Sequence, residues 1–293
     1  MTETKYTSLS GRVRLTKNYQ SLLLLACVVI FVVLFSVFTL SGASTGSSAA
    51  QVTAPKSLYA ETGPYVCEHH YTAKILVHEP LVMRIDNFLS YREADHIVEL
   101  ARPRFQRSPV ASSNGDSVHE ARTSSTAFLG KSHDDVIACV EERASMLTSF
   151  PVNHIESLQV VHYAKGQRYL PHYDYFAKSD PEAYKKYTAN GGQRVITIFG
   201  YLNEISSNPP EEWIAEKEKE GANITELIAK GTGGHTFFPE LKLSVYPKKG
   251  SAVLFFDMNG KGEEDPMTLH GGMPPEWGEK FGLNVWIRQR EIV

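Results

Sequence analysis

The chain has few cysteines, no run of lysine or arginine, and no internal repeat. Three cysteines in 293 residues do not make a disulfide scaffold, and a chain of this length can fold around a hydrophobic core without one. Cys27 lies in an apolar segment, so Cys67 and Cys139 remain as one pair that could be joined or reduced. Without a basic run, and with a formal net charge of −3, nucleic acid is not an expected partner.

One long apolar run lies near the N-terminus. Residues 21–40 carry no charge and are long enough to cross a bilayer as a helix. A cleaved signal peptide is the alternative, because small residues follow at 41–44, but its apolar region is usually only about 7 to 15 residues long. Residues 1–20 carry two lysines and two arginines against one glutamate, which favours a cytosolic location. We therefore expect a single-pass type II protein of the endoplasmic reticulum or Golgi membrane, with residues 21–40 as the signal anchor and the remainder lumenal.

The rest of the chain divides into a linker and one domain. Residues 41–63, rich in Ser, Ala, Thr and Gly, predict a flexible stem, and residues 64–293 predict a single domain. Helical patterns come first: Ser90 and Glu93 form a capping box before an apolar stripe, and Ser132 is expected to cap a second helix. Strand-like patterns follow from about residue 155, notably at 195–201, 243–246, 252–256 and 281–287. Helices before a run of short strands indicate an α+β fold.

Two His-x-Asp sequences occur, and they stand in different contexts. His133 and Asp135 lie at the start of the second predicted helix, where acids favour the positive end of the helix dipole. His172 and Asp174 follow an alternating run at 158–163 and a turn at 165–167, which together predict strand, turn and strand. Alternate residues of a strand share a face, so His172 and Asp174 are expected to reach one ion together.

His270 and Lys280 extend this pattern to that of an iron oxygenase. Two imidazoles and one carboxylate on one face of iron(II) leave the other positions open for a ligand and oxygen. Lys280, ten residues after His270, supplies a positive charge for the far carboxylate of a keto acid bound to the metal. Histidines buried for structural reasons and a surface lysine are the alternatives. The pattern predicts a non-haem iron oxygenase that consumes 2-oxoglutarate.

Eight short motifs occur in a fixed order: ARTSS (121–125), QVVHY (159–163), YLPHYDYF (169–176), GGQRV (191–195), GGHTFFP (233–239), PKKG (247–250), LHGG (269–272) and WIR (286–288). Together they resemble the catalytic domain of prolyl 4-hydroxylases, most closely the short plant and algal type, over roughly residues 80–290. Many members of that family carry a cysteine where this chain has Met273. The resemblance implies a double-stranded β-helix (jelly-roll) core with N-terminal helices packed on it. It also implies the use of Fe²⁺, 2-oxoglutarate, O₂ and L-ascorbate.

The resemblance further assigns roles to single residues. The implied iron ligands are His172, Asp174 and His270. The implied contacts to 2-oxoglutarate are Lys280, Tyr163 and Thr197, with Trp286 lining the pocket. The implied contacts to an extended proline-rich peptide are Arg122, Ser124, Glu156 and Tyr169. Taken without the resemblance, Tyr163 and Trp286 would more often belong to the core, and the peptide-contacting residues could equally be ordinary surface or structural residues.

The expected reaction is hydroxylation of peptidyl proline at C4 in proline-rich or collagen-like polypeptides, coupled to decarboxylation of 2-oxoglutarate to succinate and carbon dioxide. A related oxygenase that acts on another residue or on a small molecule would keep the iron ligands and Lys280 but change the substrate wall. A non-catalytic, membrane-anchored binding protein would keep the fold and lose a ligand. The sequence does not predict the oligomeric state.

Residues 205–232 form a charged insertion that departs from the family pattern, with a predicted helix at 211–220. One interpretation is a solvated surface excursion, and the other is a lid over the substrate, since long insertions in compact domains are often functional. Asn223 and Thr225 within it belong to a glycosylation sequon, which would fit lumenal exposure.

Overall fold

The computed structural model describes residues 65–67, 70–110, 117–118 and 120–293. The predicted cytosolic tail, the apolar segment 21–40 with Cys27, and the whole of the predicted stem lie outside these residues. No helix in the described part is long and apolar enough to cross a membrane. The signal anchor and the type II topology therefore stay predictions.

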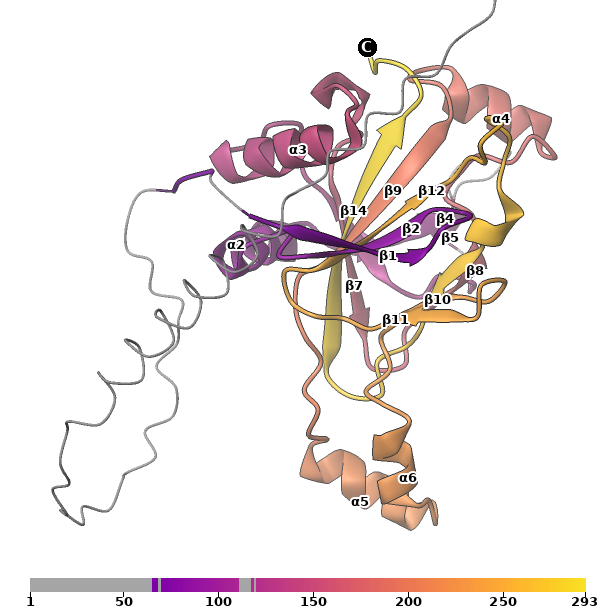
Figure 1. Cartoon of the computed structure of the whole chain (residues 1–293). Coiled ribbons are helices and arrows are strands. Elements are labelled where there is room, and N and C mark those ends of the chain that lie inside the picture. Colours follow the sequence, from indigo (N-terminus) through magenta and orange to yellow (C-terminus); the bar gives the residue numbers. More distant parts are fainter. Residues whose placement is uncertain (1–64, 68–69, 111–116, 119) are drawn as a thin grey trace, which may run out of the picture. The chain divides into compact units, whose positions relative to one another are not determined.

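Antiparallel strands form three sheets (Figure 1). The first has eight strands in the order β1 (Thr72–Val77), β2 (Val82–Asp86), β12 (Ala252–Phe256), β9 (Arg194–Tyr201), β14 (Glu279–Arg288), β7 (Gln159–Ala164), β6 (Ser125–Phe128) and β3 (Gln106–Arg107). The second has four strands in the order β11 (Leu243–Val245), β10 (Thr236–Phe238), β13 (His270–Gly272) and β8 (Tyr169–His172). The third pairs β4 (Pro109–Val110) with β5 (Ser117–Val118).

Helices and short 3₁₀ segments connect or cover these strands. Their bounds are α2 (Tyr91–Ala101), η1 (Arg102–Arg104), α3 (Asp135–Thr148), η2 (Val152–His154), α4 (Pro181–Thr188), α5 (Glu211–Lys219), α6 (Ile224–Ala229) and η3 (Pro266–Thr268). Antiparallel sheets combined with these helices confirm a mixed fold, and the four predicted strands correspond to β9, β11, β12 and β14. The expectation that helices come first was wrong, because β1 and β2 precede α2. Every residue of β1 is exposed or half-buried, so its sequence carries little of the apolar alternation by which a strand is recognised.

The two N-terminal helices begin differently from one another. Ser90 caps α2 as predicted: its hydroxyl accepts from the Glu93 N–H at 3.1 Å, and the Glu93 carboxylate accepts from the Ser90 N–H at 2.7 Å. The N-cap of α3 is Asp134, whose Oδ1 accepts from the Ile137 N–H at 2.9 Å, so the prediction that Ser132 caps this helix was wrong. Ser132 instead donates from its N–H and hydroxyl to Glu141 of the same helix. The acid in the first turn was correctly predicted, since Asp135 opens α3.

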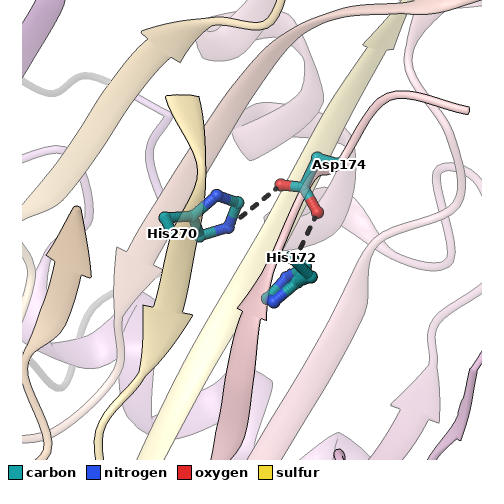
Figure 2. Close-up of side chains that lie close together, drawn as sticks. All are labelled: His172, Asp174 and His270. Carbon is teal, nitrogen blue, oxygen red and sulfur yellow. Dashed lines mark ion pairs between the residues drawn. The ribbon is translucent and has the colours of Figure 1, made fainter. Parts of the chain in front are cut away.

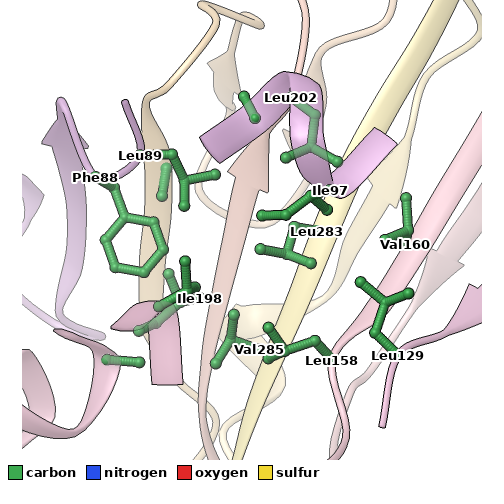
Figure 3. Packing of buried hydrophobic residues seen from close by; sticks show 14 of the residues in the cluster. Phe88, Leu89, Ile97, Leu129, Leu158, Val160, Ile198, Leu202, Leu283 and Val285 are labelled. Carbon is green, nitrogen blue, oxygen red and sulfur yellow. The ribbon is translucent and has the colours of Figure 1, made fainter. Parts of the chain in front are cut away.

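Alternate residues of the central strands separate two packing layers. On β14, the side chains that join α2 and α3 in one hydrophobic cluster (Figure 3) are Phe281, Leu283, Val285 and Ile287. The intervening side chains of β14 point to the opposite face of the sheet, as strand geometry requires. The four-stranded sheet packs there, with the rings of Phe238 (β10) and Phe255 (β12) 5.2 Å apart. The eight-stranded sheet therefore lies between the helices on one face and the four-stranded sheet on the other.

A disulfide joins Cys67 to Cys139 of α3, with their Cα atoms 5.6 Å apart. The sequence had left open whether this pair forms. The bond ties the segment before β1 to the helical layer.

The insertion 205–232 connects β9 of the large sheet to β10 of the small sheet and folds as α5 and α6 (Figure 1). The helix predicted at 211–220 is confirmed as Glu211–Lys219. Trp213 is the buried residue of α5, and its ring lies 4.8 Å from that of Trp277. An ion pair between Lys165 and Glu216, with 2.6 Å between Nζ and Oε2, joins the insertion to the turn between β7 and β8. The base of the insertion is therefore anchored, while most of its charged surface is exposed.

Candidate active site

Three side chains with metal-binding atoms meet at the four-stranded sheet (Figure 2). His172 ends β8, and its direct partner across the sheet is His270, which begins β13. Nε2 of His172 lies 3.7 Å from Oδ1 of Asp174, and Nε2 of His270 lies 3.6 Å from Oδ2 of the same carboxylate. The candidate ligand atoms all lie within 4.8 Å of one another, and no second group of this kind occurs in the described part of the chain.

Asp174 reaches this position by a different route from the one that its spacing predicted. The prediction placed His172 and Asp174 on one strand, but β8 ends at His172 and Asp174 follows in a bend. The carboxylate is held by the bend and its side-chain contacts, and not by the pleat of a strand. The two residues still face one site.

Both imidazoles are oriented through their second nitrogen. Nδ1 of His172 lies 2.8 Å from the Leu170 carbonyl oxygen, and Nδ1 of His270 lies 3.0 Å from the Thr268 carbonyl oxygen. A carbonyl only accepts, so Nδ1 carries a proton in each ring, and Nε2 is the nitrogen that faces the candidate metal position.

The protonation states also suit a cation. Burial lowers the pKa of His172 to about 3, so this ring is neutral at physiological pH. Burial alone would raise the pKa of Asp174. The nearby His270, His172 and Arg194 lower it by a larger amount, so the net shift of the pKa is downward. Two imidazoles and one carboxylate form a donor set that suits iron(II) and leaves coordination positions for other ligands.

Lys280 is a buried cation on β14. Its side chain is 1% exposed, and Nζ has no hydrogen-bond partner among the described residues. Aromatic rings surround it: Nζ lies 5.2 Å from the ring centroid of Tyr163 and 5.0 Å from that of Phe199. Burial lowers the pKa of Lys280 to about 7. An unpaired buried ammonium is unfavourable, so this position fits an anionic group supplied from outside the chain.

One cavity of about 480 Å³ contains both features. The three candidate metal ligands and Lys280 all line it. Of the other residues singled out in the sequence, those that line the same cavity are Tyr163, Trp286, Arg122, Glu156 and Tyr169. The site residues therefore converge from β7, β8, β13 and β14 and from the segments next to them.

Two predicted site residues, Ser124 and Thr197, do not line this cavity. Ser124 is fully buried behind Arg122, with its hydroxyl 2.9 Å from that of Ser108. The Thr197 hydroxyl lies 2.9 Å from Asp174 Oδ2 and 3.1 Å from Asp257 Oδ2. The predicted contact of Thr197 with 2-oxoglutarate is not supported by this arrangement, because its one hydroxyl already lies between two carboxyl groups.

Thr236 was not identified from the sequence, although it stands in the GGHTFFP motif. It lines the cavity, and its hydroxyl accepts from that of Tyr201 at 2.9 Å. Its position on β10, across from the large sheet, became evident only from the fold.

Two arginines of the cavity were also missed. Arg194 donates from Nε and Nη2 to the two oxygens of Glu156 at 2.7 and 2.8 Å, and Arg288 donates to Glu156 Oε1 at 2.8 Å. Burial raises the pKa of Glu156, but the two arginines lower it more, so Glu156 is ionised. The Arg194 guanidinium also lies 3.6 Å from the centroid of the Trp286 ring. Both arginines stand in recognised motifs, GGQRV and WIR, which was the available signal.

An aromatic wall lines the side of the cavity next to α4. It is formed by Tyr173, Tyr175, Phe176 and Tyr187. Phe176 and Tyr187 are stacked, with ring centroids 5.2 Å apart and planes inclined by 15°. No residue of the insertion 205–232 lines the cavity, and Figure 1 shows α5 and α6 well away from α4.

Comparison with known proteins places this site in a family. Residues 158–288 match the sequence model of the 2OG-Fe(II) oxygenase superfamily. Probable prolyl 4-hydroxylase 10 of Arabidopsis thaliana is 33% identical over 282 residues, which cover 94% of this chain and 93% of the relative. Prolyl 4-hydroxylase 5 of the same plant is 35% identical over 227 residues, which cover 75% and 72%. The chain belongs to the prolyl 4-hydroxylase family of 2-oxoglutarate and iron(II)-dependent oxygenases. Fe²⁺, 2-oxoglutarate and O₂, which the sequence predicted, are the cofactor and cosubstrates of these enzymes, and L-ascorbate is typical of prolyl hydroxylases.

Similar solved structures include viral collagen prolyl hydroxylase from Paramecium bursaria Chlorella virus-1 in complex with 2OG. That similarity has a TM-score of 0.48 and 25% sequence identity, and it covers 71% of this chain and 95% of the viral chain. A prolyl-4-hydroxylase from Pseudomonas putida gives a TM-score of 0.44 and 16% identity, over 71% and 92% of the two chains.

Proposed function

We propose that this protein hydroxylates peptidyl proline at C4 in proline-rich or collagen-like polypeptides, coupled to the decarboxylation of 2-oxoglutarate to succinate and carbon dioxide. The observation that carries the proposal is the shared cavity, where the His172, Asp174 and His270 donor set and the unpartnered Lys280 lie together. Relatives that match most or all of the catalytic part of the chain are named as prolyl 4-hydroxylases, which favours proline as the target.

Different residues of the cavity bind the metal and the cosubstrate. His172, Asp174 and His270 hold iron(II), which together with 2-oxoglutarate and O₂ supplies the oxidising power for C–H hydroxylation. Lys280 pairs with the distal carboxylate of the keto acid. Tyr163 is the direct partner of Lys280 across β7 and β14, and burial raises its pKa to about 12. It therefore remains a phenol and donates a hydrogen bond to the same carboxylate.

The opposite part of the cavity suits an extended peptide. A polyproline II segment keeps its backbone carbonyls free and needs little ordering, so it binds aromatic surfaces and fixed donors well. Here the aromatic wall of Tyr173, Tyr175, Phe176 and Tyr187 supplies the surface, together with Trp286. Arg194 supplies a guanidinium group held in place by Glu156. Arg288 donates to Glu156 and to the backbone carbonyls of Gly192, Tyr187 and Asn190, so it supports Glu156. The peptide contacts assigned to Arg122 and Tyr169 remain part of the proposal.

The test is a direct assay of the product. The protein is incubated with Fe²⁺, 2-oxoglutarate and ascorbate and a panel of serine–proline, polyproline and collagen-like peptides. A mass gain of one oxygen, with hydrolysis yielding 4-hydroxyproline, is the expected result. Succinate formation that depends on a different residue or on a small molecule, with proline peptides unmodified, would favour the related-oxygenase alternative. The non-catalytic alternative requires that no succinate forms under any condition, and the assembled donor set argues against it.

We propose further that the eight- and four-stranded sheets form a double-stranded β-helix. All of the pairs within both sheets are antiparallel, and the sheets pack face to face through Tyr201, Phe238 and Phe255. The site lies between them, which agrees with ligand sites in other barrel-like β folds.

We propose a lumenal location for the catalytic domain, with residues 21–40 as the anchor and residues 1–20 cytosolic. The Cys67–Cys139 disulfide supports this, because such bonds persist in oxidising compartments. Asn223 is exposed and caps α6 through Oδ1, which leaves its amide nitrogen available for a glycan. A protease added to sealed microsomes should cut only the N-terminal tail. Digestion of the catalytic domain in intact vesicles would contradict this topology.

A further inference from the structure

We propose that Asp257, a buried acid outside the metal-ligand set, is a positioning residue that fixes the Asp174 carboxylate through the hydroxyl of Thr197. The inference rests on the iron site of the proposed function. It concerns how that site is held and not which substrate it serves.

Asp257 follows β12 and is fully buried. Its backbone is held on both sides: its N–H donates to the Val195 carbonyl at 3.0 Å, and its carbonyl accepts from the Asp265 N–H at 3.1 Å. Its Oδ2 lies 3.1 Å from the Thr197 hydroxyl oxygen, and its Oδ1 has no hydrogen-bond partner among the described residues. A buried carboxyl with an unpartnered oxygen destabilises a fold, so a structural role does not explain its presence.

The Thr197 hydroxyl connects this acid to the site. Thr197 stands on β9, and its hydroxyl oxygen lies 2.9 Å from Asp174 Oδ2. A hydroxyl has one proton and can donate only once. If both carboxyl groups were ionised, one carboxylate oxygen would face a hydroxyl lone pair at hydrogen-bond distance. The contacts are satisfied when the Asp257 carboxyl donates to Thr197 and Thr197 donates to Asp174. The chain of hydrogen bonds then has one direction and ends on the metal ligand.

Each of the three metal ligands is then oriented by a hydrogen bond with a group outside the ligand set. The His172 and His270 rings are oriented by carbonyl groups of their own segments, at Leu170 and Thr268. Asp174 lies in a bend beyond β8, where no strand pairing fixes its side chain. The hydrogen bond from Thr197 sets the rotation of the carboxylate and therefore decides which lone pairs face the imidazoles. Groups that orient metal ligands in this way typically contribute about 10- to 100-fold to metal affinity.

The test compares substitutions that keep the hydrogen bonds from Asp257 through Thr197 to Asp174 with substitutions that remove them. Asp257→Asn keeps a donor toward Thr197, whereas Asp257→Leu fills the space without one. Thr197→Val removes the hydroxyl that links Asp257 to Asp174. Thr126→Val is the matched control on β6, away from the metal ligands. Each variant is titrated anaerobically with Fe²⁺ by calorimetry, and its thermal unfolding is recorded without metal.

We expect Fe²⁺ affinity near that of the parent protein for Asp257→Asn and Thr126→Val, and about tenfold weaker or more for Asp257→Leu and Thr197→Val. The melting temperature of Asp257→Leu should not fall, because the substitution removes a poorly satisfied buried carboxyl. Unchanged Fe²⁺ affinity in both Asp257→Leu and Thr197→Val overturns the proposal. Equal losses of affinity in the Asn and Leu variants, together with lowered melting temperatures, also overturn it in favour of a structural role. A parent protein that binds Fe²⁺ but leaves every proline peptide unmodified contradicts the proposed function alone.

Discussion

The ring of Tyr169 lies face to face with the imidazole of His172, with their centroids 3.5 Å apart and their planes inclined by 16°. The Arg122 guanidinium lies 4.7 Å from the centroid of the same tyrosine ring, and its Nη2 donates to Gln159 Oε1 at 3.0 Å. Family resemblance assigns both residues to peptide binding. Their contacts indicate that they also hold a metal ligand in place.

Tyr169→Leu should therefore weaken Fe²⁺ binding. Loss of the stacked ring removes about 0.5–1.5 kcal/mol of contact with His172, or a factor of about 2 to 12 in affinity. Tyr169→Phe keeps the ring and should keep the affinity. Anaerobic Fe²⁺ titration measures both. A raised peptide KM with unchanged Fe²⁺ affinity in Tyr169→Leu would show that this residue serves the peptide alone.

Lys280→Met should separate stability from cosubstrate binding. Removing an unpaired buried ammonium should stabilise the protein without ligand by about 1–3 kcal/mol, measured by urea unfolding at neutral pH. The same change should weaken 2-oxoglutarate binding by about two decades or more, because the distal carboxylate loses its partner. Lys261→Met, at an exposed position, is the control and should change neither quantity. A destabilised Lys280→Met variant would show that the ammonium has a partner in the folded protein.

The affinity for 2-oxoglutarate should fall as pH rises through about 7. Burial lowers the pKa of Lys280 to about 7, so in the free protein the side chain is charged below this pH and largely neutral above it. The cosubstrate carboxylate selects the charged form. Each pH unit above 7 should weaken binding by up to about tenfold, and binding at pH 8 should take up close to one proton. Calorimetry in two buffers with different ionisation enthalpies measures that uptake.

A second readout of the same group is the pH dependence of folding without ligand. Between about pH 7 and its unfolded value of 10.5, Lys280 is protonated in the unfolded chain but not in the native protein. Its contribution to the unfolding free energy therefore increases with pH in this window. Lys280→Met should remove that contribution. A 2-oxoglutarate affinity that does not change between pH 6 and 8 would contradict the assignment.

Arg194→Lys should impair peptide binding. Lysine cannot reproduce the two parallel hydrogen bonds to Glu156 or lie flat on Trp286. We expect a raised peptide KM and a loss of stability of about 2–4 kcal/mol, since one partner of a buried ionic cluster is mismatched. A lowered kcat with unchanged KM would place Arg194 at the reacting atoms and not at the peptide.

Replacing residues 214–230 with a short Gly–Ser linker should leave the peptide KM and Fe²⁺ affinity unchanged. No residue of the insertion lines the cavity, and this deletion keeps Trp213 against Trp277. Loop length alone changes the closure entropy by well under about 1 kcal/mol. A raised peptide KM would favour the lid interpretation of this segment.

The sequence predicted the parts of the site that depend on local patterns. The apolar residues Phe281, Leu283, Val285 and Ile287 alternate on one strand, which assigns Lys280 and Trp286 to the other face. The same alternation places Asn284 and Arg288 on the cavity side, and it could have identified them.

The features of the site that the sequence did not predict depend on contacts between segments that lie far apart in the sequence. The pairing of Glu156 with Arg194 and Arg288 joins residues separated by 38 and 132 positions. Thr197 has the strand position of a cavity residue, but Asp257 from another segment and Asp174 from the bend occupy its hydroxyl. The position of Asp174 beyond β8 could not be read from spacing, because a two-residue interval satisfies a strand and a bend equally.

The two sheets divide the site between them. His172 and His270 stand on the four-stranded sheet, whereas Lys280 and Tyr163 stand on the eight-stranded sheet. One molecule of 2-oxoglutarate bound to the metal and to Lys280 would then link the two sheets. Amide hydrogen exchange in β8 and β13 would be slower with 2-oxoglutarate bound than without it. The cellular concentration of 2-oxoglutarate would in this way determine how rigid the peptide-binding surface is.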